Sequence, residues 1–319
     1  MNPPGSGGII SIVCLIISVP LFLLQLSTLP IFLIYENYRK NVCFRILFTN
    51  AITDSIILGV MAIYAAINLL TVGEMSLWVE KIGAAIMMQI FCLVVLQHFL
   101  LAVNRLIIIL RSRYLGSKSF CDEEREAKIF NAAHIFIWIA YFVNVAAFLT
   151  SYFGGRFDRE KSSFYYDLSL PYTDTYHNVA FWIVNIFPLI CFGIYMVIIA
   201  LAMESRRRMQ RGEAAEALLS SFEQRLLIQA AILYSVMFAL ILEWKLLGGL
   251  SIEWQAALIE VPYLFYCGLN PILFLTMNKE FRNRYKTVIL SKPMELARTI
   301  SSSASSNVRS KSSNMTTPI

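Results

Sequence analysis

Seven long apolar stretches constrain the fold of this 319-residue chain more than any other feature of its sequence. A helix needs about 20 mostly apolar residues to cross the hydrocarbon core of a bilayer. These runs are continuous, whereas the strands of a membrane β-barrel alternate in segments of about ten residues. The sequence therefore predicts an all-α membrane protein, a seven-transmembrane helix bundle with spans at residues 9–35, 46–72, 83–110, 129–153, 178–203, 226–248 and 254–277.

Composition agrees with this prediction and excludes several classes of protein. The chain is 57% hydrophobic and 15% charged, whereas soluble domains are about 45–50% apolar and about 25% charged. A soluble globular enzyme, a disordered chain and a secreted disulfide scaffold are thereby excluded. We divide the chain into a short extracellular N-terminus (1–8), one membrane domain (9–277), an amphipathic interfacial helix (278–290) and a disordered Ser/Thr-rich tail (291–319).

The positive charges predict how the chain crosses the membrane. Lys and Arg residues number 21 on the side that holds loops 36–45, 111–128 and 204–225 and the tail, against five on the other side. Because cytoplasmic loops are enriched in these residues, we expect a multi-pass plasma-membrane protein with its N-terminus outside and its C-terminus in the cytosol. The distribution of the charges that give the net charge of +6 therefore points to a lipid bilayer as the partner, and we predict no nucleic-acid partner.

The cysteines and the glycosylation sequon are consistent with this orientation. None of the six cysteines lies in a predicted outer loop, so we predict no outer disulfide; they are Cys14, Cys43, Cys92, Cys121, Cys191 and Cys267. The one sequon, at Asn314, falls on the predicted cytosolic tail, where it stays unmodified.

Polar residues inside the spans are candidate functional positions, because they are costly in lipid and face the bundle or a water-filled cavity. Asp54, with Asn50 one helical turn away, is either a cation or water site or a carboxyl tied into interhelical hydrogen bonds. Asn104 and Arg105 close the third span, where position alone describes a snorkelling arginine. His98 is either a proton-sensitive group or a hydrogen-bonded core histidine.

The seventh span carries a polar stripe on one helical face. Glu260, Tyr263, Cys267 and Asn270 are spaced three, four and three residues apart. Glu260 and Tyr263 lie in the outer half of the span and form a candidate ligand pocket. Alternatively, Glu260 pairs with Lys245 or with a hydroxyl group.

The end of the last span carries a recognisable motif. Asn270-Pro271-Ile272-Leu273-Phe274 is followed at once by a short amphipathic segment. With the seven spans, Asn104-Arg105 and Asp54, it resembles a G-protein-coupled receptor of the rhodopsin-like plan. The short N-terminus, Leu29-Pro30 before the first basic loop, Asn104-Arg105 in place of an Asp-Arg pair and the compact size resemble the nematode serpentine chemoreceptors of the gamma and V type group.

The resemblance implies a role for each matched residue. Arg105, with Asn104, would rearrange on activation and meet a heterotrimeric G protein. Asp54 and Asn270 would form the polar cluster between spans two and seven, and Asn270-Pro271 the switch segment. The chain departs from the pattern at Phe274, which replaces a tyrosine, in a sixth span without proline, and in the missing outer disulfide.

The same resemblance implies partners and a location. The implied ligand is a small extracellular chemical cue, and kinases and arrestins would act at the tail. The implied location is the sensory cilia. We expect no cofactor and no metal.

Three other classes of protein fit the sequence less well. A seven-span ligand-gated cation channel of inverted topology conflicts with the charge distribution. A transporter with inverted repeats conflicts with the absence of internal symmetry. An enzyme is not supported, because the sequence contains no nucleophile, metal or nucleotide motif, and we assign no catalytic residue.

Overall fold

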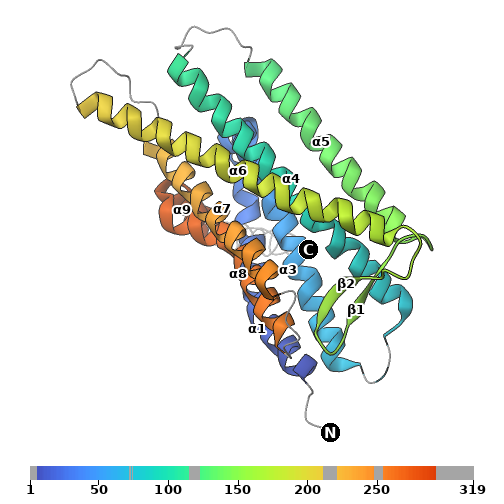
Figure 1. Cartoon of the computed structure of the whole chain (residues 1–319). Coiled ribbons are helices and arrows are strands. Elements are labelled where there is room, and N and C mark those ends of the chain that lie inside the picture. The colour runs from blue at the N-terminus through green and yellow to red at the C-terminus, as the bar shows by residue number, and fades with distance from the viewer. Residues whose placement is uncertain are drawn as a thin grey trace, which may run out of the picture.

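The structure is a computed structural model and describes residues 6–71, 73, 75–114, 123–210, 221–247 and 254–291. Seven of its helices are long and apolar enough to cross a membrane. They are α1 (Ser6–Ile34), α3 (Val42–Leu70), α4 (Leu77–Tyr114), α5 (Glu123–Phe148), α6 (Thr173–Gln210), α7 (Ser221–Leu247) and α8 (Gln255–Met277). They pack lengthwise into one bundle (Figure 1). The prediction of seven long apolar helices is confirmed.

Five shorter elements complete the described fold. They are α2 (Glu36–Lys40), α9 (Lys279–Lys286), a π-helical turn (Thr287–Ser291), and the strands β1 (Gly155–Asp158) and β2 (Ser163–Tyr166). The expectation of an all-α chain therefore needs one correction, because the 154–177 segment contains a β-hairpin. The predicted interfacial helix begins one residue later than expected and changes to π-helical geometry at Thr287.

Several helix ends differ from the predicted span ends. Helices α4 and α6 extend past both predicted ends, because a helix can continue into water after its apolar part ends. Helix α5 stops at Phe148, where the chain turns and Thr150 N–H donates to the carbonyl of Ala147. Within the predicted 36–45 loop, α2 forms, and the Asn41 side chain then accepts a hydrogen bond from Cys43 N–H at the start of α3.

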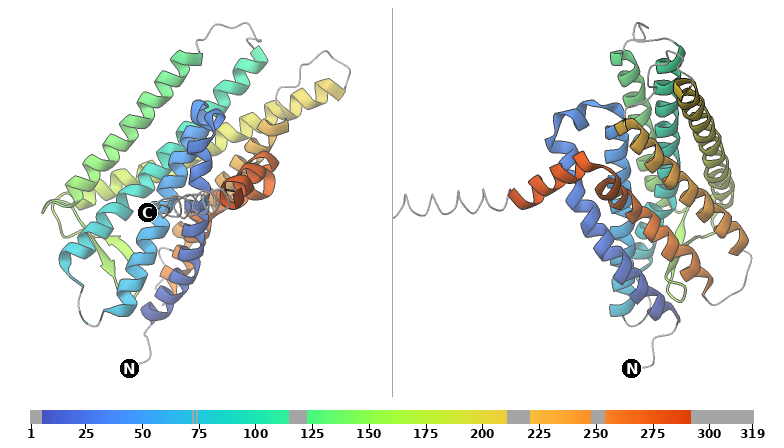
Figure 2. Two further views of the ribbon diagram at one scale, coloured as in Figure 1. Left: turned by 180° about the vertical axis from the view of Figure 1, so that it is seen from behind. Right: turned by 90° about the vertical axis from the view of Figure 1, so that its left-hand side faces the viewer.

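Helix α4 lies at the centre of the bundle. It packs against α3, α5 and α6, while α1 packs against α3 and α8, and α7 lies between α6 and α8 (Figure 2). Ile90 and Val94 of α4 pack with Ile57 and Leu58 of α3 and Leu264 of α8 in the largest apolar core. Helix α5, by contrast, is peripheral and exposes large apolar side chains along one face, among them Phe136, Ile139 and Val143. A stripe of this kind suits contact with lipid.

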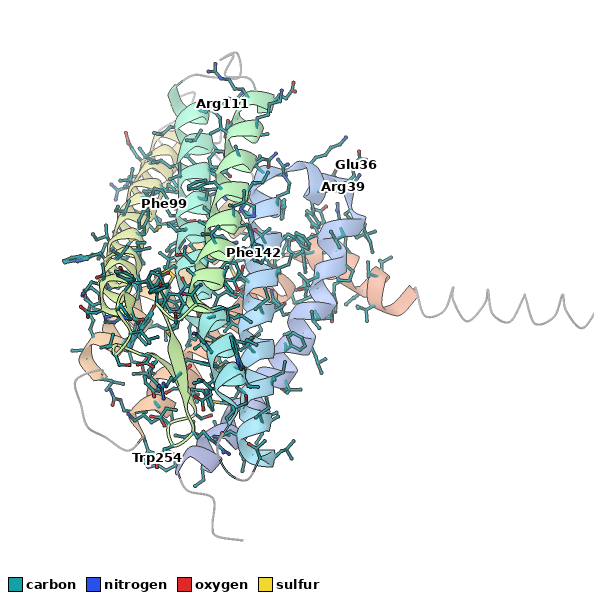
Figure 3. The ribbon with its side chains drawn as sticks, turned by 90° about the vertical axis from the view of Figure 1, so that its right-hand side faces the viewer. Glu36, Arg39, Phe99, Arg111, Phe142 and Trp254 are labelled. Carbon is teal, nitrogen blue, oxygen red and sulfur yellow. The ribbon has the colours of Figure 1, made fainter. Side chains whose placement is uncertain are left out.

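The two ends of the bundle carry different elements. Glu36, Arg39 and Arg111 lie toward one end, and Trp254 lies at the other end, together with the hairpin and the start of α1 (Figure 3). Helix α9 packs beside α2. The described segments that we assigned to the two sides of the membrane therefore lie at opposite ends.

The hairpin is held by packing and by ion pairs within it. Its strands are antiparallel, with Phe157 opposite Phe164, and both rings contact Tyr64 at centroid distances of 5.4 and 5.0 Å. Arg156 Nε donates to Asp167 Oδ2 at 2.8 Å. Partial burial opposes ionisation of Asp167, but hydrogen bonds from Ser169 and Arg156 outweigh it and lower the pKa of this carboxyl.

Arg159, at the hairpin tip, ties the hairpin to the end of α3. Its guanidinium donates to the side-chain and backbone oxygens of Asn68 at 2.8 and 3.1 Å, to the Thr71 carbonyl at 2.8 Å and to the Gly73 carbonyl. Carbonyls at a helix C-terminus lack partners within the helix and carry partial negative charge. A guanidinium with five donors suits this position.

The hairpin tip also contacts the first turns of α1. Asn68 Nδ2 donates to the Arg159 carbonyl at 3.0 Å and to Ser11 Oγ at 2.9 Å. Ser11 Oγ lies 2.9 Å from Oγ of Ser162, which adopts a positive φ of 51°. Gly7 faces the carbonyls of Arg159 and Glu160 so closely that an added Cβ would overlap both. The hairpin is thus fixed to α1 and α3 by polar contacts.

Arg159→Ala should release the hairpin. Hydrogen bonds to charged groups contribute about 1.5–3 kcal/mol each, so we expect faster deuterium exchange at the amides of β1 and β2 and a lower melting temperature. Lys161→Ala is the matched control, because Lys161 is exposed and makes only a 3.7 Å ion pair with Asp158. Equal exchange in the two variants would show that Arg159 does not hold the hairpin.

Candidate functional site

A buried polar contact joins α3 to α8. Asn270 Nδ2 donates to Asp54 Oδ2 at 2.8 Å, and both side chains are buried. The structure thus brings together two residues that the sequence analysis assigned to one polar cluster. A hydrogen bond of this kind fixes the register of two helices, because breaking it would leave a carboxyl group buried without a partner.

Asn50, the third predicted member, does not share this contact. It is buried, but its amide makes no hydrogen bond with the part of the chain that the structure describes. Instead, Thr53 joins α3 to α4 by donating to Oε1 of Gln97 at 3.2 Å. Gln97 is fully buried and was missed in the sequence, where a single glutamine in an apolar run carries no signal of its partner.

Asn270 and Pro271 lie within a continuous α8. Proline has no N–H, so Pro271 leaves the Cys267 carbonyl without its usual helical donor. The helix nevertheless continues to Met277, after which the Asn278 side chain accepts from Phe281 N–H at 3.0 Å and caps α9. The predicted switch segment is therefore one of two weakened points in α8, the other being Pro262.

Phe274, which departs from the family pattern, belongs to an inner aromatic cluster. Its ring stacks on Phe281 at 4.8 Å and meets Phe32 edge-on at 5.7 Å. Tyr38 of α2 contacts Phe281 at 6.1 Å, and the Arg284 guanidinium lies 4.6 Å from the Tyr38 ring. A phenylalanine suits this position because its surroundings are apolar.

Arg105 points into the bundle. It is only 8% exposed, and its guanidinium donates to Sγ of Cys43 at the start of α3, at 2.6 Å. No ion pair joins it to an acidic residue within the described ranges. Asn104 is also buried, and its Oδ1 accepts no hydrogen bond there. Neither residue contacts the Asp54–Asn270 pair.

His98 is a buried, hydrogen-bonded histidine. Its Nδ1 lies 2.8 Å from the Val94 carbonyl and its Nε2 lies 3.2 Å from Tyr266 Oη. Because a carbonyl only accepts, Nδ1 carries the proton and Nε2 of the neutral ring accepts from Tyr266. This geometry matches the core histidine that we considered from the sequence.

His98 belongs to a continuous series of rings that we call the aromatic column. The column consists of Phe91 and His98 of α4, Tyr195 of α6, Tyr234 and Trp244 of α7, and Tyr263 and Tyr266 of α8. Successive ring centroids lie 4.4–6.4 Å apart, which is the range of aromatic contact. Tyr195, at the other end of the column, is buried, and its hydroxyl makes no hydrogen bond within the described chain. The sequence could not reveal the column because its rings come from four separate helices.

Glu260 and Tyr263 lie at the outer end of the column. Leu258, Phe265 and Ile272 are exposed and, spaced seven residues apart, mark the outward face of α8. Glu260 lies on the opposite face, half-buried, and makes no hydrogen bond or ion pair within the described chain. The expected alternative pairing with Lys245 is not formed, because Lys245 lies over the Phe181 ring at 5.7 Å. The Tyr263 hydroxyl is buried and likewise makes no hydrogen bond there.

The remaining chemistry of the described residues is limited. They contain no group of three or more His, Cys, Asp or Glu that could hold a metal ion. Five of the cysteines are described and all are free; Cys121 lies outside the described residues. No protein-family model matches the chain, and no curated protein matches its sequence.

Asn270→Ala should destabilise the protein, because it leaves the Asp54 carboxyl buried without its donor. The expected cost is about 1–3 kcal/mol, seen as a lower melting temperature of the purified protein. Asn185→Ala is the control, since the Asn185 side chain bonds only to the Phe181 carbonyl of its own helix. If Asp54→Ala and Asn270→Ala were additive in the double variant, the contact would carry no coupling energy.

Proposed function

We propose that this protein is a G-protein-coupled chemosensory receptor that binds a small extracellular chemical cue and activates a heterotrimeric G protein in the cytosol. One observation carries the proposal. The aromatic column runs from the half-buried Glu260 and Tyr263 to His98 and Tyr195, and His98 lies about two helical turns before the buried Arg105 on the same helix, α4. The column thus extends from a candidate ligand pocket toward a candidate coupling residue. The resemblance of Asn104-Arg105 and Asn270-Pro271 to receptor motifs supports the same function.

The proposed mechanism uses two arrangements of the bundle. A ligand shifts such an equilibrium only by binding one arrangement better than the other. The ligand would bind between the outer halves of α4, α6, α7 and α8. The arrangement it favours would open the inner ends of α4, α6 and α7 beside Arg105, where the α subunit of a G protein inserts.

Two contacts described above must change in this mechanism. Arg105 must leave Cys43 to reach a G protein, because its guanidinium is buried in the present arrangement. Asn270 and Pro271 would supply the movement of α8, since a proline leaves one backbone hydrogen bond unformed. Asp54 would hold Asn270 in the resting arrangement through the 2.8 Å contact.

The proposal places α9 on the inner leaflet. Phe281 and Val288 are buried, whereas Ile289 is 37% exposed, so the apolar face of this segment is partly available to lipid. The Ser/Thr-rich tail, where kinases and arrestins would act, lies outside the described residues apart from Ser291. Part of the basic 204–225 segment also lies outside them.

Charge reversal at Arg105 tests the coupling step. Arg105→Glu should reduce ligand-independent nucleotide exchange on purified G-protein heterotrimers to background, while the amount of receptor at the cell surface stays unchanged. Lys40→Glu is the control, because Lys40 is also on the basic end but 75% exposed, paired only with Glu36. Unimpaired exchange in Arg105→Glu membranes would refute coupling through this residue.

Glycosylation mapping tests the orientation. Lys161→Asn creates a sequon with Ser163 at the hairpin tip, and the native sequon at Asn314 reports on the tail. We expect sugar at the new site and none at Asn314. Sugar at Asn314 alone would place the tail outside, refute the receptor and favour the inverted cation channel, which whole-cell current recordings would then examine.

A further inference from the structure

The positive charges at the outer end of the bundle are engaged away from Glu260. Within and around the hairpin, Arg156 pairs with Asp167 at 2.8 Å and Lys161 with Asp158 at 3.7 Å. The Arg159 guanidinium donates its hydrogen bonds to oxygens at the end of α3. The hairpin therefore offers no cation to Glu260.

The two remaining outer lysines are also engaged. Lys81 donates to the Thr150 carbonyl at the end of α5. Lys245 lies over the ring of Phe181 on α6 and is exposed. With these two, all five Lys and Arg residues on the predicted outer side have other partners. Glu260 is thus a carboxyl group on an inward helix face whose counter-ion the described chain does not provide.

Aromatic rings lie one helical turn deeper than Glu260. Tyr263 follows Glu260 by three residues, about 4.5 Å along α8. Its ring contacts Phe91 of α4 at 5.4 Å, and Phe91 meets Trp244 of α7 at 5.9 Å. The Tyr263 hydroxyl, buried without a partner, adds an acceptor on the same helix face. A carboxylate, a free phenolic oxygen and three rings are therefore brought to one level of the bundle.

We propose that Glu260, Tyr263, Phe91 and Trp244 form a subsite for an organic cation, a protonated or quaternary amine. This proposal rests on the proposed function, since it names the chemical class of the cue. A carboxylate supplies the counter-charge of an amine, and the faces of aromatic rings attract cations; Trp244, 48% exposed, forms the open side of the subsite. An anionic ligand would be repelled by Glu260, and a neutral ligand would leave its charge uncompensated inside the membrane.

Matched pairs of probes test the subsite on the purified full-length protein. The cations are choline and phenethylamine, and their neutral isosteres are 3,3-dimethylbutan-1-ol and 2-phenylethanol. Intrinsic fluorescence would report the melting temperature at increasing probe concentration. We expect at least one cation to raise the melting temperature with saturation, and its isostere to have no such effect.

Substitutions then assign the effect to the subsite. Glu260→Gln should weaken the apparent affinity of that cation by about tenfold or more, because a charged hydrogen bond contributes at least about one factor of ten. Glu243→Gln, on the outer half of α7, is the matched control and should bind like the wild type. Trp244→Leu should weaken choline more than phenethylamine, since a quaternary ammonium has no N–H to donate to Glu260 and depends more on the ring faces.

Three outcomes would overturn the inference: neither cation stabilises the wild type, the isostere stabilises it equally, or Glu260→Gln binds as well as the wild type. The measurement needs no G protein. If cation binding depends on Glu260 while Arg105→Glu leaves nucleotide exchange unchanged, the subsite stands and the coupling proposal fails. If coupling is confirmed and cations do not bind, the receptor stands and its cue belongs to another chemical class.

Discussion

A polar group inside hydrocarbon has no water to bind, so it requires a partner within the bundle or else stays buried at a cost in free energy, as the Asn50 amide does within the described chain. The contacts that meet this requirement cross between helices: Asn270 to Asp54 joins α8 to α3, Thr53 to Gln97 joins α3 to α4, and Tyr266 to His98 joins α8 to α4. Apolar packing alone would let these helices slide or rotate against one another. Because each contact requires two particular side chains to meet, together they select one arrangement. Glu260 lacks a contact of this kind, because the described chain supplies no partner for its carboxyl group.

At the end of the bundle that carries the hairpin, polar groups again bind one another across elements. The hairpin is fixed by the Arg159 guanidinium, which meets oxygens at the end of α3, and by the small residues Gly7 and Ser11 of α1. Helix ends leave carbonyls without donors, so an arginine reaching them replaces water at little cost in hydrogen bonds. A network of this kind differs from a disulfide in being reversible. The hairpin can therefore release and re-form its contacts without any covalent change.

The sequence predicts the long helices well because span length and apolar composition are local properties. Asp54 and Asn270 were placed in one cluster by the resemblance to receptors, since the residues alone do not show which polar groups of separate spans meet. The hairpin could not be predicted, because its four-residue strands depend on Phe157 and Phe164 meeting Tyr64 and on Arg159 meeting α3. Nor could the contact of Arg105 with Cys43 or the aromatic column, since both arise only when separate helices pack. Helix ends were misplaced because hydropathy does not show where a helix continues into water, as at α4 and α6, or where a turn ends it early, as at α5.

The distribution of prolines bears on how the proposed coupling would travel. Helix α7 contains Tyr234 and Trp244 and has no proline, whereas α8 contains Tyr263 and Tyr266 between Pro262 and Pro271. A helix with all its hydrogen bonds moves as a rigid rod, so a displacement of Trp244 would carry Tyr234 with it and press on His98 and Tyr195. In α8 the missing hydrogen bonds permit local bending, so Tyr263 and Tyr266 could shift before Asn270 leaves Asp54. Closely packed rings have few alternative arrangements. The column is therefore suited to switching between two discrete states, with α7 as the element that transmits the change toward Arg105.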